Sequence, residues 1–87
     1  MVSEKVRVNN PSGLQLRPAG ILCTEAMKYK SLITFQYGGG TANAKSVLSV
    51  LGACVKCGDE IIIFCEGDDE KEALRSLVTV IKNGLGE

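Results

Sequence analysis

Pro18 constrains this chain more than any other single residue, because it fixes where a helix can begin. The proline ring holds φ near the helical value and leaves no N–H to bond, so proline suits the first turn of a helix. Apolar residues then recur at the three- and four-residue spacing of an amphipathic helix. They are Ala19, Leu22, Cys23, Ala26 and Met27. The pattern predicts a helix from Pro18 to about Lys28 with this face buried.

The residues just before Pro18 predict an anion-binding loop. The first N–H groups of a helix have no partners within the helix and attract anions. Arg17 would add a forked cation beside them. Gln15 occupies the position best placed to carry a covalent phosphate, yet a carboxamide is neither a nucleophile nor a titratable group. The sequence therefore predicts a phosphate cradle without its phosphate acceptor.

Composition narrows the possible functions further. The chain contains no histidine, which removes the usual general base, the usual metal ligand and any phosphohistidine relay. Ten Lys and Arg balance ten Asp and Glu, and without a basic tract we expect no direct nucleic-acid partner. The apolar runs fall far short of the ~18 residues that span a membrane, and the first residues lack the order of a secretory signal. We expect a cytoplasmic protein with no membrane partner.

Hydrophobic patterning predicts seven elements in the order βαββαβα. Alternating or compact apolar runs indicate strands at residues 2–8, 32–37, 41–44 and 61–65. Helices are expected from Pro18, after Ser46 and after Asp69. Such an order favours a four-stranded antiparallel sheet with three helices on one face, an α/β (α+β) open-faced sandwich. We expect residues 1–87 to form a single domain.

Ser46 stands immediately before the second helix, where a serine accepts a hydrogen bond as an N-cap. This helix is expected to end before Gly58 and carries more apolar residues than one stripe can bury. We assign Val50 and Cys54 to the core. We assign the others to a docking patch beside Gln15 and Arg17, namely Val47, Leu48 and Leu51. A wholly buried helix remains the alternative.

Four cysteines leave a second class of function open. Cys54 and Cys57 form a C-x-x-C motif, and Cys23 and Cys65 lie elsewhere. Zinc sites usually use two close pairs of ligands, so we expect free thiols, no metal and no cofactor. A thiol redox or metal-binding protein is the alternative. A homodimer that exchanges its first strand is also possible, because a small open sheet has exposed edges.

Two motifs resemble those of one bacterial family. The segment Gly13–Ala19 looks like the phosphohistidine loop of HPr, the phosphocarrier of the sugar phosphotransferase system. The segment Asn43–Ser46 looks like its regulatory serine site. The chain is also similar in length and element order, which implies an HPr-like fold. Gln15 stands where the family has its phosphorylatable histidine, so the resemblance is closest to the Crh-like catabolite-repression homologues.

The resemblance implies a regulatory mechanism rather than catalysis by this chain. An HPr kinase/phosphorylase would phosphorylate Ser46, and the phosphoprotein would act as corepressor of a LacI-type catabolite control transcription factor. A phosphate at a helix N-terminus lies beside partial positive charge, so the fold should tolerate it. Arg17 would pair with an acidic residue of the partner. The predicted partner-binding residues are therefore Gln15, Arg17, Ser46, Val47, Leu48 and Leu51.

Overall fold

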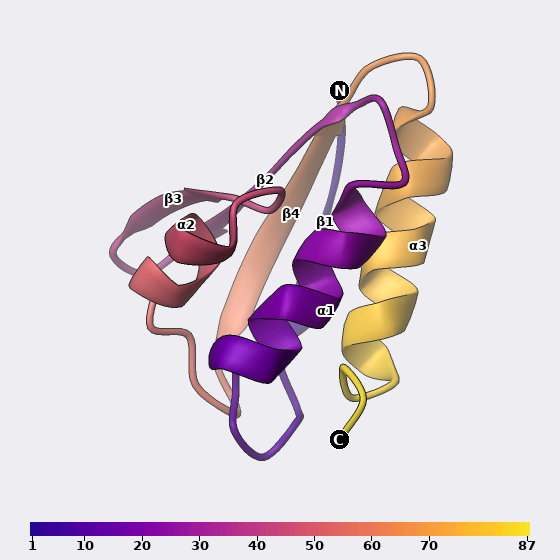
Figure 1. The fold of residues 1–87 in the computed structure, drawn as a ribbon. Coiled ribbons are helices and arrows are strands. Elements are labelled where there is room, and N and C mark those ends of the chain that lie inside the picture. The colour runs from indigo at the N-terminus through magenta and orange to yellow at the C-terminus, as the bar shows by residue number, and fades with distance from the viewer.

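The computed structural model describes residues 1–87 and contains four strands and three helices in the predicted βαββαβα order (Figure 1). The strands form one antiparallel sheet in the order β1-β4-β2-β3. The elements are β1 (Val2–Arg7), α1 (Leu16–Ala26), β2 (Leu32–Tyr37), β3 (Gly40–Asn43), α2 (Val47–Gly52), β4 (Glu60–Glu66) and α3 (Glu70–Lys82). The expected open-faced sandwich is confirmed.

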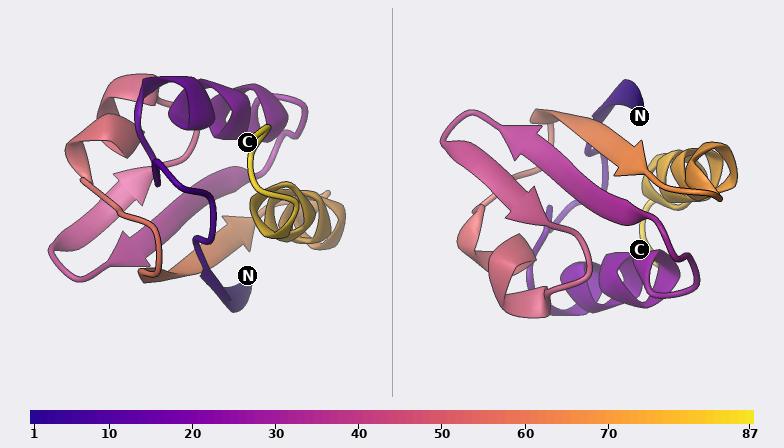
Figure 2. Two further views of the ribbon diagram at one scale, coloured as in Figure 1. Left: turned by 90° about the horizontal axis from the view of Figure 1, so that it is seen from below. Right: turned by 90° about the horizontal axis from the view of Figure 1, so that it is seen from above.

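The helices cover one face of the sheet and leave the other face open (Figure 2). Strand β4 lies between β1 and β2, and alternate residues Ile61, Ile63 and Cys65 point into the core. The alternation follows from the two-residue period of a strand. The largest fully buried side chains come from both layers and include Phe35, Leu14, Leu22, Ile33, Ile61, Leu77 and Ile81. One hydrophobic core thus holds the sheet and helices together.

Helix α1 begins two residues before Pro18, with Gln15 as its N-cap. Pro18 is the third helical residue, where an N–H would have no partner within the helix, so the ring costs no hydrogen bond. Ala19, Leu22 and Ala26 are buried as predicted. The predicted burial of Met27 is wrong, because the helix ends at Ala26 and leaves the Met27 side chain 63% exposed.

Helix α2 is shorter than predicted and ends at Gly52. Val50 is fully buried, as expected. Cys54, however, is exposed and belongs to no helix, so its assignment to the core is wrong. The four-residue spacing from Val50 to Cys54 aligns two side chains only while the helix continues. Here the backbone leaves the helix and reaches φ 54° at Cys54.

Side-chain hydrogen bonds join segments that are distant in sequence. The Asp69 carboxylate accepts hydrogen bonds from the backbone N–H groups of Lys30 and Ser31 at 2.8 and 3.0 Å. A hydrogen bond from the Ser31 hydroxyl is the largest cause that lowers the pKa of Asp69, and the two backbone bonds lower it further. They attach the loop before β2 to the start of α3. No helix of the structure combines the length and apolar character needed to cross a membrane.

Candidate functional site

The loop before α1 is fixed against the segment that follows α2. The N–H of Leu14 donates to the carbonyl of Val55 at 2.9 Å. Gly13 adopts φ 66°, and a Cβ atom there would lie 2.5 Å from the Val55 carbonyl oxygen and 2.8 Å from Cα of Lys56. The position thus requires glycine for its backbone angle and for the close approach. Both contacts place Gln15 at a defined point beside the 54–57 segment.

Gln15, Leu16 and Arg17 are exposed where α1 begins. The Gln15 side chain forms no capping hydrogen bond, while its backbone carbonyl accepts from the N–H of Ala19 at 2.8 Å. Arg17 forms no ion pair within the chain. A carboxamide, a free guanidinium and the positive end of the helix therefore face outward together, an arrangement that suits an acidic partner.

Glu87 closes the other side of this loop, a contact that the sequence did not indicate. Its carboxylate accepts hydrogen bonds from the Ser12 hydroxyl at 2.6 Å, the Ser12 N–H at 3.1 Å and the Asn10 amide at 2.9 Å. The Ser12 hydroxyl bond is the largest cause that lowers the pKa of Glu87, and the nearby charge of Arg17 lowers it slightly further. Glu87 therefore holds the loop as a carboxylate.

Ser46 is the N-cap of α2, as the sequence predicted. Its hydroxyl oxygen accepts a hydrogen bond from the Ser49 N–H at 3.2 Å. The Ser49 hydroxyl oxygen in turn accepts from the N–H of Asn43 at 2.9 Å. These bonds fix the turn on which Ser46 lies, and the half-buried side chain stays within reach of solvent.

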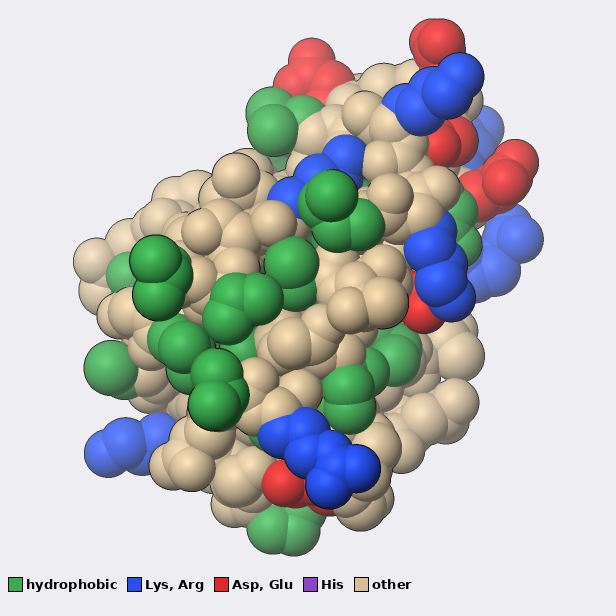
Figure 3. All heavy atoms as spheres, in the orientation of Figure 1, with side chains coloured by type: hydrophobic (Ala, Val, Ile, Leu, Met, Phe, Trp, Pro, Cys, Tyr) green, Lys and Arg blue, Asp and Glu red, His purple; other side chains and the backbone are tan.

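Hydrophobic side chains gather over α2 and the beginning of α1 (Figure 3). Leu48 and Leu16 are 81% and 70% exposed, while Val47 and Leu51 are half-buried. These four residues are called the apolar patch below. An exposed patch of this kind is typical of an interaction site.

A hollow of about 420 Å³ lies between the loop and α2. Its lining residues are Ser12, Leu14, Gln15, Leu16, Leu51, Cys54, Val55 and Lys56. The structure thus brings Gln15 and Leu51, two of the predicted partner-binding residues, to one hollow. Ser46 and Arg17 do not line it. Cys54 and Lys56 do, although the sequence analysis assigned them no place there.

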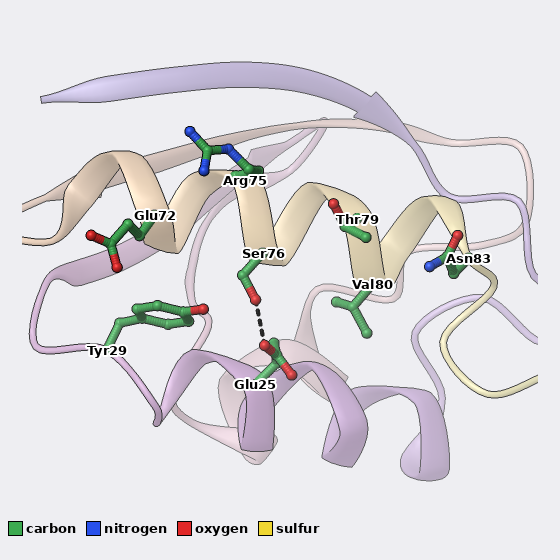
Figure 4. Close-up of a pocket in the computed structure, with 8 residues that line it drawn as sticks. All are labelled: Glu25, Tyr29, Glu72, Arg75, Ser76, Thr79, Val80 and Asn83. Atoms are coloured by element: carbon green, nitrogen blue, oxygen red, sulfur yellow. Dashed lines mark hydrogen bonds between the residues drawn. The ribbon is translucent and has the colours of Figure 1, made fainter.

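A second hollow, of about 660 Å³, lies between α1 and α3 (Figure 4). Its lining is mostly polar, and none of the predicted site residues lies there. The Glu25 carboxylate accepts a hydrogen bond from the Ser76 hydroxyl across it and another from the Lys28 ammonium at 2.9 Å. Both bonds lower the pKa of Glu25. These partners give Glu25 a role in joining the two helices.

No group of three or more His, Cys, Asp or Glu side chains is arranged to hold a metal ion. The four cysteines are free thiols and lie in different surroundings. The site is therefore a surface of loop, helix ends and apolar side chains around a small hollow. Its features define a small open-faced sandwich with an exposed loop at the start of α1, an apolar patch and no metal site.

Comparisons with known proteins identify the family. A family model described as the PTS HPr component phosphorylation site matches residues 2–83. The HPr-like protein Crh of Bacillus subtilis is 35% identical over 82 residues, which cover 94% of this chain and 96% of that protein. The chain therefore belongs to the HPr family.

Solved structures agree with this assignment. The structure of HPr-C-His from Thermoanaerobacter tengcongensis matches with a TM-score of 0.96 at 33% identity, covering 100% of this chain and 98% of that one. A crystal structure of Bacillus subtilis Crh, described as an intertwined dimer with a swapped domain, matches with a TM-score of 0.77 at 34% identity, covering 97% of each chain. This chain is thus similar both to phosphocarriers and to Crh.

Proposed function

We propose that this chain is a non-catalytic regulatory protein whose activity is switched by phosphorylation of Ser46. HPr kinase/phosphorylase is the proposed modifying enzyme, and the phosphoprotein acts as corepressor of a LacI-type catabolite control transcription factor. The chain does not carry phosphohistidine. One observation carries this proposal: Gln15 occupies the outward-facing N-cap of α1 while a capping serine, Ser46, remains available at α2.

The first part of the proposal follows from side-chain chemistry. Phosphocarrier chemistry needs a nucleophilic nitrogen that can accept and release a phosphoryl group. The chain has no histidine, and the amide nitrogen of Gln15 is neither nucleophilic nor titratable. Yet the loop around Gln15 is ordered by the tightly packed Gly13 and by hydrogen bonds to the rest of the fold. An ordered, exposed loop without a phosphate acceptor supports binding rather than phosphoryl transfer.

The second part rests on the position of Ser46. A phosphate here would add about −1.5 to −2 charges at the positive end of α2. Its oxygens could still accept the hydrogen bond from the Ser49 N–H. Basic residues of the partner would pair with the phosphate, Arg17 with an acidic residue, and the apolar patch would be covered. Charge-assisted hydrogen bonds of this kind select the phosphorylated form.

We place the protein in the cytoplasm, where both proposed partners would work, and expect no direct contact with nucleic acid. Homodimerisation by exchange of β1 is compatible with this function, because β1 forms one edge of the sheet. The dimeric Crh structure supports this possibility for a related chain. An unphosphorylated binding module or homo-oligomer that regulates other metabolic proteins is the second candidate, supported by the apolar patch itself.

The proposal is tested by intact mass after incubation with HPr kinase/phosphorylase and ATP. The parent should gain one phosphate, Ser46→Ala none, and Ser49→Ala one, which makes Ser49 the matched control in the same helix. An HPr substrate confirms that the kinase is active. Absence of phosphate on the parent under these conditions would exclude the corepressor mechanism and favour the unphosphorylated binding module.

A further inference from the structure

The four cysteines divide into two enclosed and two exposed thiols. The Cys23 thiol donates a hydrogen bond to the Lys45 carbonyl at 3.1 Å and is half-buried. Cys65 is buried in β4, and this burial raises the pKa of its thiol to about 11, with a smaller contribution from Asp69 and Glu70. A buried thiol that stays protonated is inert. Cys54 and Cys57 are therefore the two thiols most accessible to small molecules.

Only one of these two exposed thiols belongs to the hollow beside Gln15. Cys54 lines this hollow together with the apolar side chains of Leu16 and Leu51, whereas Cys57 does not. The single charged residue in the lining is Lys56. The hollow thus combines an apolar wall, a thiol and one cation. This combination is complementary to a small thiol compound that carries carboxylates.

The backbone around Cys54 is tied to the Gln15 loop on one side and to β4 on the other. The Leu14 N–H donates to the Val55 carbonyl, and Gly13 packs directly on Lys56. The Lys56 N–H donates to the Asp59 carboxylate at 2.9 Å, just before β4. These contacts hold the backbone next to Cys54 beside Gln15, so a group attached to Cys54 starts from a fixed point at the edge of the hollow.

We propose that Cys54 is a thiol–disulfide exchange site, which takes a low-molecular-weight, carboxylate-bearing thiol as a mixed disulfide seated in the hollow beside Gln15. The Cys54 thiolate attacks one sulfur of the corresponding small-molecule disulfide. A new sulfur–sulfur bond forms, the old one breaks, and the other half leaves as a thiolate, which takes up the proton that Cys54 released. Excess reduced thiol reverses the step. Lys56 binds a carboxylate of the attached group.

This modification regulates the docking surface, a consequence that rests on the proposed function. The attached group occupies the hollow between Gln15 and Leu51 and covers part of the surface offered to the kinase and the transcription factor. Oxidation would thus reduce phosphorylation of Ser46 without any change at Ser46. Cys57 serves as an internal control for Cys54, because it is also an exposed thiol but does not line the hollow.

The site is tested by equilibrating the full chain in buffers of reduced and oxidised glutathione and measuring the adduct by intact mass. Cys57→Ser retains only Cys54 as an exposed thiol, and Cys54→Ser retains only Cys57. The exchange equilibrium constant of Cys57→Ser should be larger by about two- to fivefold, the strength of one exposed charge pair. Adding Lys56→Gln to Cys57→Ser should remove this difference. Equal constants for the two thiols would overturn the proposal.

A second measurement separates this site from the proposed function. The glutathione adduct of Cys57→Ser should shift the backbone NMR signals of Gln15 and Leu16 more than those of α3, and unchanged signals would also overturn the proposal.

The kinase should phosphorylate the reduced protein faster than the adduct, and equal rates would refute regulation through Cys54. If even the reduced protein gains no phosphate, the proposed function fails, while the exchange constants and NMR shifts still decide the thiol site.

Discussion

The hydroxyl of Ser12 donates a hydrogen bond to the carboxylate of Glu87 at 2.6 Å, across 75 residues of chain. This bond and those from Asn10 and the Ser12 N–H close the loop that presents Gln15. The end of the described chain therefore helps to shape the candidate site. Each hydrogen bond is stronger to the carboxylate of Glu87 than to its protonated form, so the loop and the protonation of Glu87 are linked.

Glu87→Gln should lower the thermal stability at neutral pH, and this loss should disappear in acid. The hydrogen bonds hold the pKa of Glu87 below its ordinary value of 4.5. The stabilisation is therefore complete above about pH 4.5 and is lost as the pH falls through the lowered pKa of the folded state. Thermal melts from pH 7 to pH 3 test this. Parent and variant curves that stay equally separated at every pH would contradict it.

Gly13→Ala should destabilise the fold by more than about 2 kcal/mol, because it adds left-handed strain and a clash. The new Cβ would lie 2.5 Å from the Val55 carbonyl oxygen. Gly20→Ala is the matched control, since nothing lies within 4 Å of a Cβ there. In the middle of α1 this change should stabilise by up to about 1 kcal/mol. Urea unfolding of both variants gives the two free energies, and equal effects would refute the close packing at Gly13.

Cys54→Gly should stabilise the fold by about 1 kcal/mol, because glycine relieves the left-handed backbone at φ 54°. Cys54→Ala keeps a Cβ atom and should leave stability nearly unchanged. Thermal melts under reducing conditions compare the two. A gain shared equally by both variants would point to the removal of the thiol rather than to backbone relief.

The features that the sequence predicted correctly depend on residues that lie close together in the chain. The period of the apolar residues was sufficient for the element order, and Ser46 was predicted as an N-cap because capping involves only residues three positions apart. The prediction of buried residues failed at the C-terminal ends of α1 and α2, because both helices end earlier than predicted. Met27 and Cys54 both keep the apolar spacing of their helix but lie just beyond its last residue.

The rest of the site depends on contacts that have no local signal. The carboxylate of Glu87 meets Ser12 only because the chain after α3 turns back to the start of α1. Lys56 likewise joins the hollow beside Gln15 because the backbone at Gly13 packs against it. A single sequence records the residue types at these positions but not their pairing. Knowledge of the fold was needed to place them.

Ser46→Ala should destabilise the fold by about 1 kcal/mol, because the Ser49 N–H loses its capping acceptor. Ser46→Asp should retain stability, since aspartate is an equally good N-cap and places a negative charge at the positive end of α2. Urea unfolding measures both variants. Equal losses for alanine and aspartate would contradict the view that this position accepts negative charge without cost.

The central claim concerns the selectivity of the phosphorylated form, and a binding titration tests it most directly. A LacI-type catabolite control protein is titrated with kinase-treated parent, untreated parent and kinase-treated Ser46→Ala. The account predicts a Kd at least about tenfold lower for the phosphorylated parent than for the other two, the effect of one added charged hydrogen bond. Equal binding of phosphorylated and unphosphorylated protein, or no binding of either, would contradict it.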